Sequence, residues 1–393
     1  RLWWNRLDKA LCSYGLVPIR ADRCCYVLYS STAPSLRKTV KFTDCQTNDL
    51  QALEANTCPG RACPAIREAN AFSNTSTKTK TLQPSYDFDL NAALDYLLDP
   101  ISGSQARGKT VEGVLTIHVD DAFFAGTSVF HKNVIESLRR DFKVGSEDLN
   151  DVLFVGQRVR WIDRADPKKR HIRVDQETKV EELGEINFDT SLRDDITCPP
   201  DLHTQYRSVL GQINWLQSRT QYQSCYLFSR CASAAAGPKI GDIRAINKLV
   251  RKIRAEIVVL RFWQLSMSSS RIIGYPDAAY CNNADKSSQR GQVIFIAEGR
   301  IKGKKDTRGS LIDYESQKIK KTVLSTTVSE LYAFMKCFGT CQFLRGMWMD
   351  ISGCPAELHM RTDANNLVTT ASTTHLPNQK ETIHMINQLR YES

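Results

Sequence analysis

The hydrophobic positions of the chain follow a helical period at its start and a strand period soon afterwards. From Leu2 to Tyr14, apolar residues recur every three or four positions and Gly15 follows, which predicts an amphipathic helix with a glycine stop. Cys24–Tyr29 is a short apolar run of the kind that forms a buried strand. The first 30 residues therefore predict one helix and one strand.

Residues 31–110 show no sustained period. They are rich in Ser, Thr, Asn and Lys and contain five prolines, and only the leucines between Leu90 and Leu98 have helical spacing. A stretch of this length and composition cannot bury much apolar surface. It is predicted to be a low-complexity insertion or a flexible linker.

An ordered pattern returns at Val114. Val114–Val119 and Ala122–Gly126 are apolar runs separated only by Asp120 and Asp121, which predicts a β-hairpin with two carboxylates at its tip. Apolar residues at every fourth position from Phe130 to Phe142 then predict a helix that packs on this hairpin.

The remaining chain predicts strands and helices in alternating groups. Before residue 269 we expect strands at Leu153–Trp161 and His171–Val174 and helices at Val209–Leu216 and Ile243–Ile257. After it we expect strands at Ile272–Asp277, Gln292–Ile296, Thr322–Leu324 and Leu358–Thr362 and helices at Val328–Phe343, Ala364–Thr370 and Lys380–Arg390. The predicted fold class is α+β or α/β, multidomain, ending in a domain with a mixed sheet and flanking helices.

Composition narrows the class of protein. Hydrophobic residues make up 41% of the chain, enough for ordinary cores, while the longest apolar runs have the length of strands and predict no membrane span. The net charge of +10 suits a polyanionic partner. Arg1-Leu2-Trp3-Trp4 has no initiator Met and no signal sequence, so we expect a piece of a longer chain.

The 13 cysteines show no spacing typical of a zinc site or a disulfide framework. We expect reduced and mostly buried thiols.

Asp120 and Asp121 are the first candidates for chemistry. Two adjacent carboxylates repel each other unless a cation lies between them, and hard oxygen ligands suit Mg²⁺. The alternative is an exposed turn that simply favours Asp.

The second group of candidates for chemistry consists of Asp277, Glu330 and Asp363. They fall at a strand end, within a helix and at another strand end, an order that lets three carboxylates converge over a sheet. Such a cluster can hold the two Mg²⁺ ions of phosphodiester cleavage. The alternative is three unrelated, solvated acids.

Two further stretches are relevant to phosphate binding. The stretch Arg300–Lys321 is basic and precedes the predicted helix that contains Glu330. It is either a surface that follows a nucleic-acid backbone or a solvated loop. The side chains that would contact nucleic acid are Lys302, Lys304, Lys305, Lys318, Lys320 and Lys321. Gly103–Thr110 fits the G-x-x-x-x-G-K-[ST] pattern but lies between a helix and a strand in the wrong order, so we interpret it as linker.

Ordered motifs resemble a known family of polyproteins. Asp22-Arg23-Cys24-Cys25-Tyr26 resembles the S-x-x-D-x-C-x-Y segment of a polymerase, and Ile117–Asp121 resembles its Y-V-D-D motif. Phe154-Val155-Gly156 is similar to an F-L-G primer-gripping hairpin, and Tyr206–Gly211 is similar to Y-R-S-x-x-G.

The C-terminal motifs are more specific. Gly274–Tyr280 resembles G-Y-S-D-A-D-W, Lys286–Gly291 resembles R-x-S-T-S-G, Ser325–Ala333 resembles S-S-T-E-A-E-Y-x-A, and Thr362–Asn366 resembles C-D-N-x-S. In this order the motifs resemble the C-terminal part of a copia-type LTR retrotransposon Pol polyprotein, in which ribonuclease H follows reverse transcriptase.

The resemblance implies a domain scheme and site roles. The segments are a partial reverse-transcriptase palm at 1–30, the insertion at 31–110, the palm hairpin with primer-grip-like strands at 111–175, thumb or connection helices at 176–268 and a ribonuclease H-like domain at 269–393. Asp120 and Asp121 correspond to polymerase metal ligands, and Asp277, Glu330 and Asp363 correspond to ribonuclease H ligands of Mg²⁺ or Mn²⁺. His384 stands where the family has a fourth acid, and histidine is a poorer ligand for a hard cation.

The resemblance also implies a function and its limits. The family's upstream polymerase Asp is absent, so we expect a polymerase-dead fragment that retains RNA-strand degradation on an RNA–DNA hybrid. The alternatives are a decayed product, or a domesticated module, that binds nucleic acid without catalysis. We expect cytoplasmic virus-like particles or the nucleus as its location and upstream Pol segments as partners; the sequence leaves the oligomeric state open.

Overall fold

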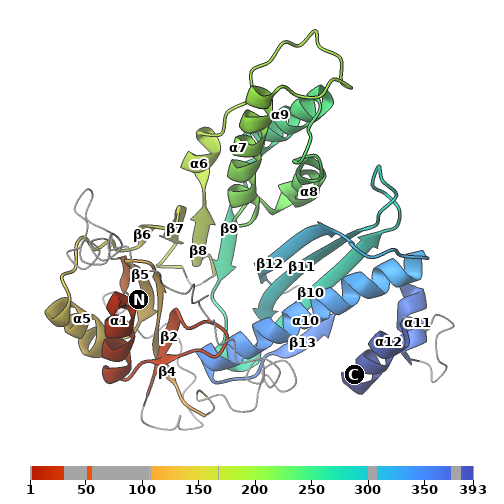
Figure 1. The fold of residues 1–393 in the computed structure, drawn as a ribbon. Helices are drawn as coiled ribbons and strands as arrows, with labels where there is room; N and C mark the ends of the chain where they lie inside the picture. The colour runs from red at the N-terminus through yellow and green to blue at the C-terminus, as the bar shows by residue number, and fades with distance from the viewer. Residues whose placement is uncertain are drawn as a thin grey trace, which may run out of the picture. The chain divides into compact units, whose positions relative to one another are not determined.

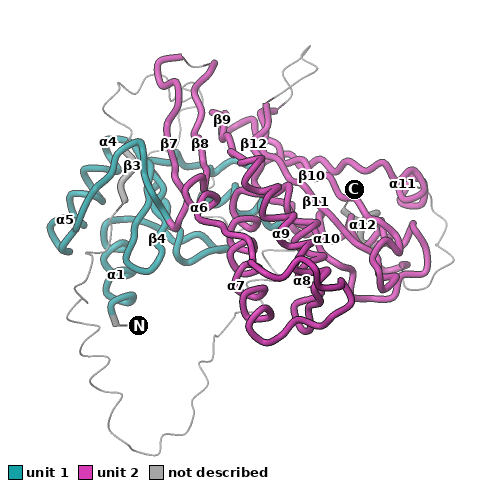
Figure 2. Tube along the Cα trace, turned by 90° about the horizontal axis from the view of Figure 1, so that it is seen from above, with its two compact units in different colours: residues 1–154, 343–355 teal, residues 155–342, 356–393 magenta. Residues whose placement is uncertain are grey.

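The computed structural model describes residues 2–30, 51–54, 106, 108–166, 168–299, 308–372 and 382–392. The chain divides into two compact units, which Figure 2 shows in different colours. Unit 1 comprises residues 1–154 and 343–355, and unit 2 comprises residues 155–342 and 356–393.

Unit 1 is built around a five-stranded sheet. Its strand order is β1-β2-β4-β5-β3, and its strands are β1 (Val17–Pro18), β2 (Cys25–Tyr29), β3 (Gln51–Glu54), β4 (Val111–His118) and β5 (Asp121–Gly126). The neighbours pair antiparallel. The predicted hairpin is therefore present as β4 and β5. Strand β3 lies in the stretch predicted as linker, and most of that stretch, including Leu90–Leu98, is outside the described residues.

Helices cover this sheet with the apolar faces that the sequence predicts. Helix α1 (Leu2–Ser13) ends before Gly15, whose φ of 92° is the left-handed conformation that glycine adopts at a helix end. The predicted helix after the hairpin is present as α4 (Ser128–Phe130), a π-helical turn (His131–Ile135) and α5 (Glu136–Asp141). Leu11, Leu115, Phe124 and Phe130 belong to the core of unit 1.

The predicted strand Leu153–Trp161 is two strands, β6 (Asp151–Phe154) in unit 1 and β7 (Gln157–Ile162) in unit 2, separated by Val155 and Gly156. In unit 2, β7, β8 (His171–Asp175) and β9 (Leu260–Trp263) pair antiparallel.

A helical layer follows β8 in the chain. It consists of α6 (Glu177–Glu181), α7 (Pro200–Gln217), α8 (Cys225–Ser233) and α9 (Ile240–Ala255). Two of these helices were predicted, although α7 is longer than the predicted segment; α6 and α8 were not. Their core contains Tyr206, Ile213, Ile243 and Val250, all buried.

The C-terminal half of unit 2 is a four-stranded mixed sheet with helices (Figure 1). The strand order is β12-β11-β10-β13, with β10 (Ser270–Ala279), β11 (Gln289–Glu298), β12 (Gly309–Lys318) and β13 (Glu357–Met360). The β10–β11 and β11–β12 pairs are antiparallel, and β13 is parallel to β10. The helices are α10 (Thr326–Ser352), α11 (Asn365–Ser372) and α12 (Ile383–Glu392).

One predicted strand is wrong. Thr322–Leu324 is not a strand but part of the segment before α10, and Leu324 is 69% exposed. The third strand of this sheet is instead β12, whose sequence mixes acids with apolar residues and lacks the alternation that signals a strand. The predicted mixed sheet with flanking helices is otherwise present.

The fold is thus mixed α and β, with several sheets. None of the helices in the described ranges is both long and apolar enough to cross a membrane.

Candidate metal centre

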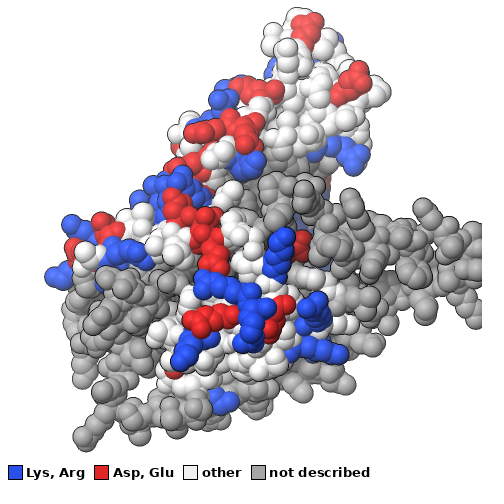
Figure 3. Space-filling model, turned by 90° about the vertical axis from the view of Figure 1, so that its left-hand side faces the viewer, with Lys and Arg blue, Asp and Glu red and all other residues white. Residues whose placement is uncertain are grey.

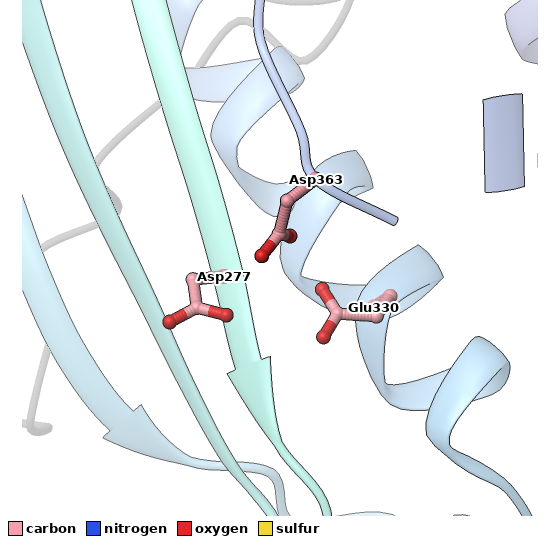
Figure 4. A group of neighbouring side chains, drawn as sticks. All are labelled: Asp277, Glu330 and Asp363. Carbon is pink, nitrogen blue, oxygen red and sulfur yellow. The ribbon is translucent and has the colours of Figure 1, made fainter. Parts of the chain in front are cut away.

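Three carboxylates that are distant in sequence meet at the end of β10 (Figure 4). Asp277 lies near the end of β10, Glu330 lies in the second turn of α10, and Asp363 lies just after β13. One oxygen of each carboxylate lies within 4.8 Å of the others. We call Asp277, Glu330 and Asp363 the acidic cluster.

The parallel pairing of β10 with β13 brings Asp277 and Asp363 to the same end of the sheet. Gly274 is opposite Met360 in this ladder, and the Arg361 N–H donates to the Gly274 carbonyl oxygen at 2.9 Å, which extends the pairing by one residue. Beyond this pairing the two segments continue in the same direction, one to Asp277 and the other to Asp363.

Helix α10 supplies the third acid because it begins close to this end of the sheet. The Ser325 hydroxyl accepts the Val328 N–H at 3.3 Å and caps the first turn. Leu331 and Val328 are buried beside Glu330 and fix the helix face toward the sheet. Glu330 is therefore half-buried, whereas Asp277 and Asp363 are exposed.

The glycine in β10 permits close contact between helix and sheet. A Cβ placed on Gly274 would lie 2.7 Å from Cys341 Sγ and 2.9 Å from Cys337 Sγ, both on α10. Any larger residue would push α10 away and carry Glu330 with it. Gly274 was not among the predicted site residues; the signal that indicates its role is a glycine inside an otherwise apolar strand.

Electrostatics in the acidic cluster favour a bound cation. Burial, followed by repulsion from Asp277 and Asp363, raises the pKa of Glu330 to about 7, although the backbone N–H of Ala278 donates to it and opposes the shift. A divalent cation among the three carboxylates would remove this repulsion. Carboxylate oxygens are the ligands that Mg²⁺ and Mn²⁺ prefer, so the residues present fit such an ion.

The structure does not add His384 to this cluster. His384 is an exposed residue of α12, and the group of potential ligands formed by the described residues comprises only the three acids. The expectation that histidine takes the place of a fourth ligand therefore has no support in the geometry.

The Asp120–Asp121 pair is built differently. Asp120 is exposed in the two-residue turn between β4 and β5, where Val119 has a φ of 57°. Asp121 begins β5 and is half-buried, and its Oδ1 is buried without a hydrogen-bond partner. Within the described part of the chain, no third acid, histidine or cysteine joins the two in a group that could hold a metal ion.

The predicted basic surface is only partly described, since Lys302, Lys304 and Lys305 lie outside the described residues. Lys318 forms an ion pair with Asp285, and Lys321 lies 5.6 Å from the centre of the Tyr332 ring. Lys320 is exposed. Figure 3 shows one face of the molecule on which Lys and Arg alternate with Asp and Glu, so the excess positive charge is not gathered into a uniform patch there.

Comparisons with known proteins were made for sequence and for structure. No family model matches the chain, and no curated protein matches it. Among solved structures it is similar to the "Structure of the foamy viral protease-reverse transcriptase in complex with RNA/DNA hybrid", with a TM-score of 0.41 and 13% sequence identity. The match covers 88% of this chain and 42% of that chain, so this chain spans less than half of that protein's length. A likeness of this size does not assign the chain to a family.

Proposed function

We propose that the chain is a divalent-cation-dependent nuclease of the ribonuclease H type, which cleaves the RNA strand of an RNA–DNA hybrid. The observation that carries the proposal is the acidic cluster, in which three carboxylates from separate elements lie within 4.8 Å of one another. The order of the motifs around Asp277, Glu330 and Asp363 supports the choice of substrate, because it resembles the ribonuclease H part of copia-type Pol polyproteins.

Asp277, Glu330 and Asp363 would hold Mg²⁺ or Mn²⁺. When bound, such ions activate water and stabilise the leaving oxygen of a phosphodiester. The chain itself keeps the three carboxylates at a fixed separation, through the β10–β13 ladder and the close packing of α10 at Gly274. The Ala278 N–H orients the Glu330 carboxylate.

We further propose that this chain does not copy a template. Asp120 and Asp121 would be polymerase ligands by resemblance, but two carboxylates on one turn are too few to hold the metal ions of phosphoryl transfer without a further acid. In this proposal the chain corresponds to the palm, thumb and ribonuclease H parts of a copia-type Pol protein, and acts inside the cell together with upstream Pol segments.

The hybrid would be held by basic side chains of the stretch Arg300–Lys321, which precedes α10 in the sequence. Lys320 and Lys321 precede α10, which carries Glu330, and Lys320 is exposed. Lys302, Lys304, Lys305 and Lys318 are the remaining candidates. Phosphate contacts of this kind give binding that weakens steeply with salt.

The second candidate function is nucleic-acid binding without catalysis, as expected of a decayed or domesticated retroelement product. The observation that favours it is that His384 does not join the acidic cluster, so the described residues supply three carboxylates and no fourth ligand.

The deciding experiment is incubation of the purified chain with an end-labelled RNA–DNA hybrid, with and without Mg²⁺, beside Asp277→Asn. We expect metal-dependent cleavage that the substitution abolishes while circular dichroism stays unchanged. Cleavage that persists in the variant would overturn the proposal. Salt-dependent binding with no cleavage would establish the second candidate instead.

A further inference from the structure

Three sulfur atoms converge at Gly274 of β10, two of them from α10 and one from β13. A Cβ placed on Gly274 would lie 2.7 Å from Cys341 Sγ, 2.9 Å from Cys337 Sγ and 3.0 Å from Met360 Sδ. We call Cys337, Cys341 and Met360 the sulfur cluster.

The two cysteines are placed to act together. They lie one turn apart on α10, both are fully buried, and their thiols are hydrogen-bonded to each other. This contact, together with burial, raises the pKa of the Cys341 thiol. The Cys341 thiol therefore stays neutral unless a cation compensates the charge of its thiolate.

Met360 is also one of the residues that line a cavity. The cavity has a volume of about 460 Å³ and is lined by Met360, Phe334, Leu367 and Ala371, among others. A cation that enters this cavity therefore reaches the Met360 side chain.

We infer that the sulfur cluster binds one soft monovalent cation, Cu(I), through the thiolates of Cys337 and Cys341 and the thioether of Met360. Thiolate and thioether ligands select soft cations such as Cu(I), whereas Mg²⁺ and Mn²⁺ prefer the oxygens of the acidic cluster. Binding replaces the two thiol protons, which pass to solvent. No change in the oxidation state of copper or sulfur is involved.

This site is chemically separate from the acidic cluster and does not depend on the proposed nuclease activity. The ordinary alternative is that Cys337 and Cys341 are small apolar residues chosen for the close contact at Gly274. The two explanations differ in one respect, because only a copper site needs the sulfur of Met360.

The test is Cu(I) titration of the reduced full chain under anaerobic conditions, in competition with a chromophoric Cu(I) chelator. Since other thiols of the chain also bind copper, the measured quantity is the difference between variants. We expect Cys337→Ala and Cys341→Ala each to bind one equivalent of Cu(I) fewer at the sites of highest affinity. Met360→Leu should lower the Cu(I) affinity of these sites by at least about 10-fold. The matched control is Cys225→Ala, which removes a buried thiol of α8 in the same unit and should change nothing.

Thermal unfolding with and without Cu(I) gives a second readout. Copper should raise the melting temperature of the wild type and of Cys225→Ala but not of Cys341→Ala. Met360→Leu preserves the size of the side chain, so it keeps the test valid if a cysteine variant fails to fold. Copper binding and stabilisation that are equal in the wild type and in Met360→Leu would overturn the inference and leave close packing as the role of the sulfurs.

Discussion

The two acidic sites of this chain show how differently neighbouring and distant carboxylates are placed. Asp120 and Asp121 are adjacent in the sequence, yet one is exposed in a turn and the other begins a strand with a buried, unpartnered oxygen. Asp277, Glu330 and Asp363 come from a strand, a helix and a loop, yet their oxygens lie within 4.8 Å. Among the described residues no third ligand joins Asp120 and Asp121, so closeness in sequence alone does not produce a group of three metal ligands. Convergence of separate elements does.

The largest difference between the two sites should appear in catalysis. Asp363→Asn removes one ligand of the acidic cluster, and loss of a direct ligand should cost at least as much as the loss of outer-shell support, so we expect at least about a 100-fold fall in the rate of hybrid cleavage. Asp120→Asn should leave this rate unchanged. Both variants are measured on the same end-labelled hybrid, and equal losses would contradict the separation of the two sites.

Cation binding should distinguish the sites without reference to activity. A divalent cation present at about 100 times its dissociation constant stabilises the folded state by about 2.7 kcal/mol. We expect Mn²⁺ to raise the melting temperature of the wild type and of Asp121→Asn, and to have little effect on Asp277→Asn. A wild-type shift that persists in Asp277→Asn would place the cation elsewhere.

Substitutions of glycine test the packing that holds each site. Gly274→Ala should cost about 1–3 kcal/mol, because its Cβ would overlap the sulfurs of α10, and it should also weaken the Mn²⁺ response by displacing Glu330. Urea denaturation measures the first effect and thermal unfolding with Mn²⁺ the second.

Two controls sharpen this prediction. Gly339→Ala lies on the same helix with nothing within 4 Å of the added Cβ, so it should stabilise the chain by about 0.5–1 kcal/mol. Gly113→Ala would overlap Phe130 in the core of unit 1, so it should destabilise that unit and leave the Mn²⁺ response intact. A weaker Mn²⁺ response in Gly113→Ala would contradict the assignment of the metal to unit 2.

The two sites should also differ in the pH dependence of stability. The pKa of Glu330 rises from its usual value of 4.5 to about 7 in the folded chain. Between these values the folded state binds a proton that the unfolded state has released, so the free energy of unfolding should fall as pH rises through this window. Glu330→Gln should flatten that dependence in urea denaturation between about pH 5 and 8, and so should Mg²⁺ in the wild type. Asp120→Asn should leave the pH dependence of the free energy of unfolding unchanged. If Glu330→Gln also leaves it unchanged, repulsion within the acidic cluster is weak.

Much of the secondary structure could be predicted because local patterns determine it. The helix that ends before Gly15, the hairpin of β4 and β5 and the helix after it follow directly from apolar period and turn residues. Strand β12 could not be predicted in this way. Its mixture of acids and apolar residues is stabilised by pairing with β11 and by contacts such as the ion pair of Glu315 with Arg290, and a single segment does not reveal these partners.

The acids of the cluster could be named from motif resemblance, but not their separation. The basic stretch illustrates the same limit, because Lys318 at the end of β12 forms an ion pair with Asp285 in the loop between β10 and β11. Whether a charged side chain is available to a ligand depends on neighbours that the fold brings to it.

The sequence by itself determined the helices and strands with a clear period, the excess of positive charge and the candidate acids, because these depend on residue type and on spacing over a few turns. Only the tertiary structure decided that Asp277, Glu330 and Asp363 meet, that His384 does not join them and that three sulfurs gather at Gly274. The physical reason is that these distances follow from the parallel pairing of β10 with β13 and from how closely α10 packs on the sheet. Both are long-range contacts, and no local stretch of sequence encodes either one alone.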